Sequence, residues 1–126
     1  MLKNNIEVDV KVKCIEAETT QAKLLHENDK ALDRPDFCIG TDDFHTPARI
    51  RERLSDYFVR RGYSVKVDSP FSGTMVPEAY YRKDERVMSV MIEVNRRLYI
   101  NDNAVKSGQY EMIKAVIRGA IDEVSR

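Results

Sequence analysis

The order of apolar and polar positions along the chain predicts a set of strands and helices. Over residues 6–13, β-branched apolar residues alternate with charged ones, which is typical of a strand with one buried face. Its charged partners favour an edge position in a sheet. The segment 16–28 is polar and fits either a frayed helix or a loop. The short apolar run 36–40 ends in glycine and predicts a buried strand.

The segment 47–61 has the features of an amphipathic helix. Thr46 suits the N-cap, and Pro47 suits the first helical position, where its missing N–H does no harm. Apolar residues then recur at helical spacing as far as Gly62, which suits a left-handed C-terminal cap. Alternating apolar residues over 63–67 predict a strand directly after this cap. The order strand, helix, strand implies a right-handed crossover and a sheet that is at least partly parallel.

The second half of the chain predicts a loop, a strand and a helix. Two prolines and a glycine fall within 69–77, which indicates a loop, and 78–85 fits a short helical turn. The nearly continuous apolar run 87–94 predicts a strand buried on both faces, near the middle of the sheet. Apolar spacing over 108–124 predicts a helix that packs on one face of the sheet. We therefore expect a single α/β domain over 1–126, with three layers and a mixed, partly parallel sheet.

Composition and charge narrow the classes of function. The 126 residues include 21 basic and 21 acidic side chains, so the formal net charge is zero. Phosphate binding needs a basic excess, and this balance argues against a nucleic-acid or acidic-membrane partner. The arginines of 49–61 alternate with acidic residues and are interpreted as a solvated helix face. No apolar stretch reaches the ~20 residues of a membrane span, and residues 1–10 lack a signal-peptide core, so we expect a cytoplasmic protein.

The two cysteines and the histidine at 45 have both structural and functional interpretations. Cys14 and Cys38 show no CxxC spacing, and reduced thiols are favoured over a disulfide. His45 lies beside Asp42 and Asp43, which resembles a metal cluster. The adjacent aspartates need not converge, however, and a helix begins directly after them, so a structural role at the start of that helix is the favoured interpretation.

Glu93 is the leading candidate for chemistry. It lies near the end of an apolar strand, where an ionised carboxylate is costly unless it is paired or used. Asn95 and Arg96 follow where the strand ends, and ligands of open α/β sheets bind at the carboxyl ends of strands. The structural alternative is that Glu93 forms an ion pair with Arg96 or Arg97. The loop 69–74 offers glycine, hydroxyl and backbone N–H groups that suit an anion, although most such loops only turn the chain.

These segments together resemble the N-formylglutamate amidohydrolase family. The matching residues keep the order and spacing of the family from about 32 to 100: Arg34–Pro47, Gly62–Val65, Pro70–Thr74, Val76–Pro77, Tyr80–Tyr81 and Met91–Tyr99. The resemblance implies half of a fold related to the zinc carboxypeptidases and the phosphorylase/hydrolase-like proteins. It also implies a zinc-dependent hydrolysis of a formyl amide, in the degradation of histidine.

The resemblance also implies roles for particular residues. Glu93 lies where the family's general base is expected, opposite a zinc ion that polarises the amide carbonyl and lowers the pKa of its water. Gly73, Thr74, Asn95 and Arg96 match the part that holds substrate carboxylates, a task suited to a bidentate guanidinium.

The chain departs from the family at its metal ligands. Family members are roughly twice as long, and their N-terminal half supplies a histidine and a glutamate from a His-Ser-Gly-type motif that does not occur here. A further histidine comes from an Asp-Cys-His-Ser-like sequence. The corresponding stretch here is Lys13-Cys14-Ile15-Glu16, with Ile15 in place of that histidine. On this alignment no zinc ligand of the family is present, and we expect no metal or cofactor in the isolated chain.

Three functional hypotheses follow. The chain is a truncated, inactive amidohydrolase, or it is a zinc-free module that binds small carboxylates such as N-formylglutamate or glutamate, or a protein partner. The third hypothesis is an active hydrolase with a different metal site, for example His45, Cys38 and Asp42. The first two are favoured, because catalysis needs a complete set of groups. The exposed strand edges of a half-fold would favour a homodimer.

Overall fold

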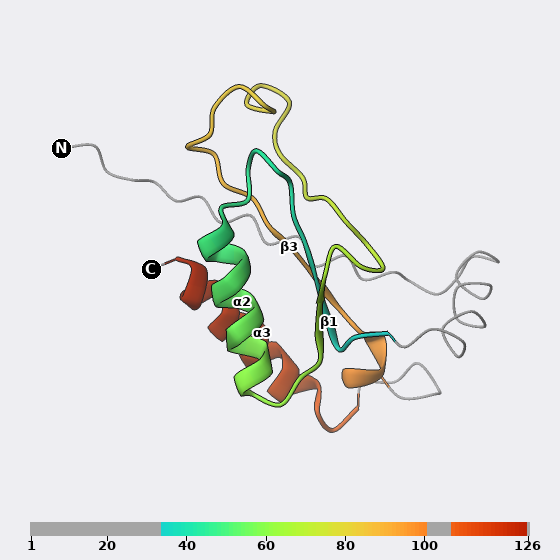
Figure 1. Ribbon diagram of the computed structural model, residues 1–126. Helices are drawn as coiled ribbons and strands as arrows, with labels where there is room; N and C mark the ends of the chain where they lie inside the picture. The colour runs from blue at the N-terminus through green and yellow to red at the C-terminus, as the bar shows by residue number, and fades with distance from the viewer. Residues whose placement is uncertain (1–33, 101–106, 126) are drawn as a thin grey trace.

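The computed structural model describes residues 34–100 and 107–125. The strand predicted over 6–13, the segment 16–28, Cys14 and Ile15 lie outside the described residues. Within the described ranges the chain forms an α/β fold with a mixed sheet, as the sequence predicts (Figure 1).

Three short strands form the sheet: β1 (Phe37–Gly40), β2 (Val65–Val67) and β3 (Met91–Val94). Their order is β2-β1-β3. β1 is parallel to β2, and the helix α2 (Ala48–Arg60) connects the two, so the predicted crossover is confirmed. β1 is antiparallel to β3, which makes the sheet mixed.

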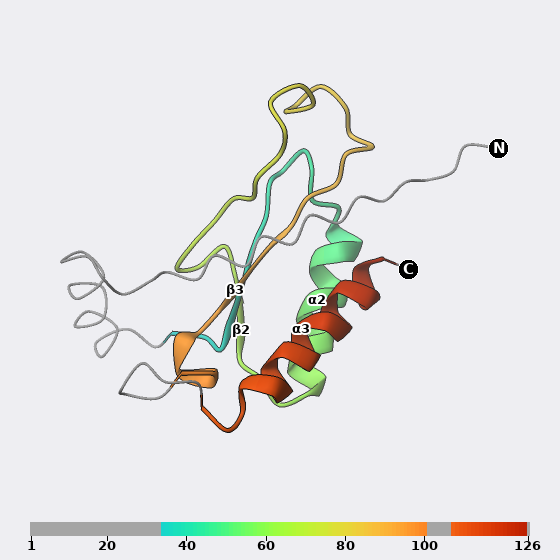
Figure 2. The same cartoon turned by 180° about the vertical axis from the view of Figure 1, so that it is seen from behind.

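Both longer helices lie on the same side of this sheet. α2 contacts β1 and β2, and α3 (Tyr110–Val124) packs along α2 (Figures 1 and 2). The expectation that both helices pack directly on the sheet is therefore right for α2, while α3 reaches the core chiefly through α2. The described residues supply a sheet and one helical layer, which are two of the three predicted layers.

The core lies between the sheet and α2. Phe37 of β1 stacks on Phe58 of α2, with ring centroids 4.0 Å apart, and Ile39 and Leu54 are also fully buried. Burial of each such side chain stabilises the fold by about 1.5–3 kcal/mol. Side chains alternate along a strand, so Cys38 and Gly40 of β1 face away from the helices. That second face carries the candidate site.

The prediction of a central strand over 87–94 is wrong in position and length. Regular pairing covers only Met91–Val94, and among the described strands β3 pairs with β1 alone, so β1 is the middle strand. The residues before Met91 bond to a turn instead of a strand. The Ser89 N–H donates to the His45 carbonyl oxygen at 2.9 Å, and the Val87 carbonyl oxygen contacts the His45 ring at 2.7 Å.

Other boundaries differ in small ways. Pro47, not Thr46, occupies the N-cap of α2, because the Thr46 hydroxyl donates to the Ser89 carbonyl oxygen at 2.6 Å. Gly62 adopts the predicted left-handed conformation, with φ of 86°. The segment 78–85 forms turns and no helix.

Gly119 gives a test of the packing between α2 and α3. An added Cβ at this position would lie 2.1 Å from the Tyr57 hydroxyl oxygen. In an open helix, Gly→Ala stabilises by about 1 kcal/mol. Here we expect Gly119→Ala to destabilise by about 1–3 kcal/mol, as overpacking does, when unfolding is measured by urea denaturation.

The matched control is Gly108→Ala, because an added Cβ there meets no atom within 4 Å. In the double variant with Tyr57→Phe, the clashing oxygen is gone, and most of the loss should be recovered. Equal stability of Gly119→Ala and the wild type would contradict the packing of α3 on α2.

Candidate functional site

The face of the sheet opposite the helices carries a row of polar side chains. Lys66, Cys38 and Glu93 occupy one register position across β2, β1 and β3. Their neighbours Phe37 and Ile39 point into the core, so alternation places this row on the second face. Glu93 is half-buried there, and the structure thus places the predicted base on a sheet face and not in the core.

The loop 69–74 crosses this face directly over β1. The Cys38 Sγ lies 3.3 Å from the Ser69 carbonyl oxygen and 3.2 Å from the Phe71 carbonyl oxygen, and the two oxygens share its single S–H proton. An added Cβ at Gly40 would lie 2.2 Å from the Gly73 carbonyl oxygen, so only glycine lets the loop approach this closely.

Cys38 serves this packing as a neutral thiol. Burial raises the pKa of Cys38, the hydrogen bond to Phe71 lowers it, and the nearby Glu93 carboxylate raises it again. The net effect is a raised pKa, which favours the neutral thiol, a poor nucleophile.

Thr74 lies at the end of the loop, beside the segment that precedes β3. Its Oγ1 is 2.6 Å from the Ser89 Oγ, and the Ser89 hydroxyl donates to the Met75 carbonyl oxygen at 2.7 Å. Thr74 is half-buried. Sequence analysis did not identify Ser89, although a serine inside the apolar run 87–94 was the available signal.

Asn95 and Arg96 lie beyond the other end of β3. The Asn95 amide donates to the Pro35 carbonyl oxygen at 3.2 Å and accepts from the Arg97 N–H at 3.1 Å. It therefore caps the short helix η1 (Arg96–Leu98), whose first residue is Arg96. These two hydrogen bonds give the Asn95 side chain a structural role.

An ion pair fixes η1 against the start of β1. Arg97 bonds to the Asp36 carboxylate at 2.8 Å, and the other carboxylate oxygen accepts the Ser64 N–H at 2.9 Å. Partial burial raises the pKa of Asp36, but the bonds from Arg97 and Ser64 outweigh it and lower the pKa overall. The position of Arg96 is thereby set by its neighbours.

The predicted site residues thus fall into two groups. Glu93, Gly73 and Thr74 share one face of the sheet, whereas Asn95 and Arg96 lie past the end of β3 that is remote from Thr74. Ser89, which bonds to Thr74, lies six residues before Asn95, a distance of about 20 Å in an extended strand. The sequence predicts that Glu93, Asn95, Arg96 and Thr74 converge on one concave patch, and this placement of Thr74 and Arg96 does not fit that prediction.

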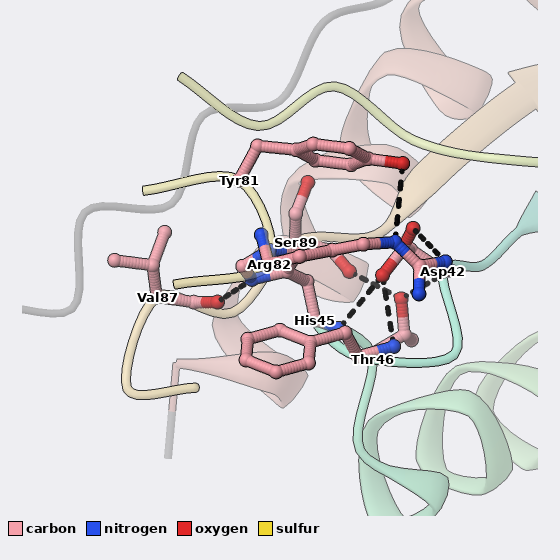
Figure 3. Close-up of polar contacts among 8 residues, drawn as sticks. Asp42, His45, Thr46, Tyr81, Arg82, Val87 and Ser89 are labelled. Atoms are coloured by element: carbon pink, nitrogen blue, oxygen red, sulfur yellow. Dashed lines mark hydrogen bonds and ion pairs between the residues drawn. The ribbon is translucent and has the colours of Figure 1, made fainter. Parts of the chain in front are cut away.

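A polar turn over 42–46 holds the segments around Thr74. Figure 3 shows the His45 ring between this turn and the segment that carries Arg82 and Val87. His45 is fully buried; its Nδ1 donates to the Val87 carbonyl oxygen at 2.7 Å, and its Nε2 accepts the Arg82 N–H at 2.9 Å. A carbonyl only accepts and an N–H only donates, so these bonds define a neutral ring with its proton on Nδ1.

Asp42 stabilises the same turn. Its carboxylate accepts the N–H groups of Phe44 at 2.8 Å and His45 at 3.0 Å, and Arg82 lies 3.9 Å away. Desolvation raises the pKa of Asp42, but these hydrogen bonds lower it overall. The structural interpretation of Asp42 and His45 as a turn before a helix therefore fits the structure.

The alternative metal site at His45, Cys38 and Asp42 does not fit these contacts. Both ring nitrogens of His45 are engaged in hydrogen bonds with backbone groups. Within residues 34–100 and 107–125, no group of three His, Cys, Asp or Glu side chains is placed to hold a metal ion.

Comparison with known proteins identifies the family. The model of the N-formylglutamate amidohydrolase family matches residues 13–100. The fold is similar to the crystal structure of N-formylglutamate amidohydrolase from Ralstonia eutropha JMP134, with a TM-score of 0.59 and 19% sequence identity. The match covers 78% of this chain and 39% of that one. No curated protein matches the chain.

The match spans most of the chain, and the chain therefore belongs to the N-formylglutamate amidohydrolase family. It covers well under two thirds of the length of the structure it resembles. No helix in the described part of the chain has both the length and the apolar character needed to cross a membrane.

The buried His45 gives a test of the polar turn. His45→Phe keeps a ring of similar size but leaves the Val87 carbonyl and the Arg82 N–H without their partner. Each buried polar group left unsatisfied costs about 1–3 kcal/mol. We expect a loss of about 2–4 kcal/mol in the free energy of unfolding, measured by urea denaturation. Tyr80→Phe, an exposed change in the neighbouring segment, should leave stability unchanged; an equally stable His45→Phe would refute the assigned hydrogen bonds.

Proposed function

We propose that this chain keeps the general base and part of the substrate cradle of an N-formylglutamate amidohydrolase, and that alone it does not hydrolyse the substrate. The observation that supports this proposal most is the position of Glu93, on a sheet face crossed by the backbone of 69–74.

Glu93 would act by taking a proton from water onto its carboxylate. In the family a zinc ion polarises the amide carbonyl and lowers the pKa of that water when it is bound. The described residues do not fit such an ion, because no suitable group of three ligands lies among them. Water with a pKa near that of bulk gives little hydroxide at neutral pH, so Glu93 alone would support little turnover.

Binding of a small carboxylate requires fewer functional groups than catalysis does. The Arg96 guanidinium can pair with a carboxylate through two parallel N–H bonds, and the backbone N–H groups at Gly73 and Thr74, which are remote from Arg96, can hold a separate anion. A second candidate function follows, that of a zinc-free module for small carboxylates such as N-formylglutamate or glutamate. The half-buried position of Arg96, fixed by the Arg97–Asp36 ion pair, supports it.

Titration with N-formylglutamate and glutamate separates these two functions. For a binding module we expect heat on mixing in calorimetry, and Arg96→Gln should weaken binding by about tenfold or more, since a charge-assisted hydrogen bond is lost. Glu93→Gln should bind at least as tightly, because a like charge near the anion is removed. Arg51→Gln, an exposed change on α2, is the matched control. Absence of binding would leave the inactive amidohydrolase as the surviving function.

Zinc content and turnover test the proposed inactivity. We expect no stoichiometric zinc by elemental analysis and no release of deformylated product from the chain alone. Addition of the N-terminal half of an active relative should still fail, because Ile15 replaces a ligand on the alignment given above. The same half with Ile15→His is expected to recover activity. Tightly bound zinc in the chain alone, with turnover that a chelator abolishes, would overturn the proposal.

A further inference from the structure

The direction of one hydrogen bond at Thr74 follows from the contacts of Ser89. The Ser89 Oγ lies 2.7 Å from the Met75 carbonyl oxygen and 2.6 Å from the Thr74 Oγ1. A carbonyl oxygen can only accept, and a hydroxyl has a single proton. The Ser89 proton is therefore committed to Met75, and Thr74 must donate its own proton to Ser89.

The turn over 42–46 holds Ser89 in the position that this bond requires. The Ser89 N–H donates to the His45 carbonyl oxygen at 2.9 Å. The Ser89 carbonyl oxygen accepts the Thr46 hydroxyl at 2.6 Å, and the Thr46 Oγ1 in turn accepts the Asp42 N–H at 2.9 Å. Each bond in this series starts or ends on a backbone group, so its direction is fixed.

We propose that Ser89 is a positioning residue that makes Thr74 a pure acceptor toward the ligand, so that Thr74 selects a nitrogen that carries hydrogen, such as an amide N–H or an ammonium group. This inference rests on the proposed function. With its proton turned to Ser89, the oxygen of the half-buried Thr74 can offer only lone pairs to a ligand. A carboxylate or ester oxygen also offers only lone pairs, and two such oxygens repel each other.

The inference changes the part that the family resemblance gives to Thr74. The Thr74 side chain does not hold a substrate carboxylate in this arrangement. A carboxylate of the same ligand is left to backbone N–H groups of the loop, because Arg96 is remote, while Thr74 contacts the nitrogen of a formyl amide. His45 and Thr46, conspicuous in the sequence but outside the chemistry, then serve to hold Ser89.

The first test concerns the bond itself and needs no ligand. In solution NMR at low temperature, the Thr74 hydroxyl proton should exchange slowly and show a cross-peak to the Ser89 β-protons. In Ser89→Ala this proton should exchange rapidly, whereas Ser72→Ala, an exposed hydroxyl change in the same loop, should leave it protected. A freely exchanging Thr74 hydroxyl in the wild type would overturn the proposal.

The second test concerns ligand selection and uses a matched pair of probes. N-formylglutamate has an amide N–H where its ester analogue, O-formyl-2-hydroxyglutarate, has an oxygen. We expect the wild type to bind the amide about tenfold more tightly than the ester, by calorimetry. The preference should disappear in Ser89→Ala, whose Thr74 hydroxyl can turn to donate, and in Thr74→Val. Ser89→Thr keeps the hydroxyl and should keep the preference.

The outcomes distinguish this inference from the proposed function. Binding of both probes with equal affinity by the wild type overturns the inference and leaves the proposed binding function in place. Binding of neither probe, with a protected Thr74 proton, overturns the assigned ligand class and the binding function, while the direction of the hydrogen bond stands. Amide spectra of residues 69–75 should match the wild type in Ser89→Thr, and so confirm that the variant keeps the loop.

Discussion

The contact between the loop 69–74 and the back of β1 determines the form of the site. At Gly40 the loop backbone comes so near that no side chain fits, and at Cys38 a thiol supplies hydrogen bonds to the loop without a charge. A larger residue at either position would lift the loop from the sheet. The separation between Thr74 and Glu93 therefore depends on two small residues that take no direct part in binding.

A second constraint on the site comes from side chains of the turn 42–46, which hydrogen-bond to backbone groups and not to one another. His45, Thr46 and Asp42 each satisfy peptide groups of the turn or of the segment before β3. Arg82 keeps a left-handed backbone with φ of 53°, and its N–H is held by His45. Polar residues in this motif thus give the loops a fixed shape, which explains how a short sheet can carry an ordered site.

The fold could be predicted from the sequence wherever local pattern and tertiary contacts agree. The helical spacing before Gly62 and the alternation over 63–67 led to α2 and β2, because one buried face sets each pattern. The run 87–94 led to a wrong prediction of a long strand, because its first half is apolar but hydrogen-bonds to the turn 42–46 and not to a strand. Glu93, Gly73 and Thr74 share a face as expected, whereas the separation of Arg96 from Thr74 depends on strand direction. The types of residue in a strand do not predict the direction in which the strand runs.

Because β1 pairs with β3 across a long separation in sequence, we expect assembly of the site to be a late event in folding. The Asn95 side chain donates to the carbonyl oxygen of Pro35, 60 residues earlier in the sequence. β1 pairs with β2 on one side and with β3 on the other. Contacts so distant in sequence form slowly, because a long loop must close before they are gained. α2 can form early from local contacts, but the face with Glu93 exists only once three separate segments have met. Any ligand bound there would therefore select the completed fold over every partly folded form.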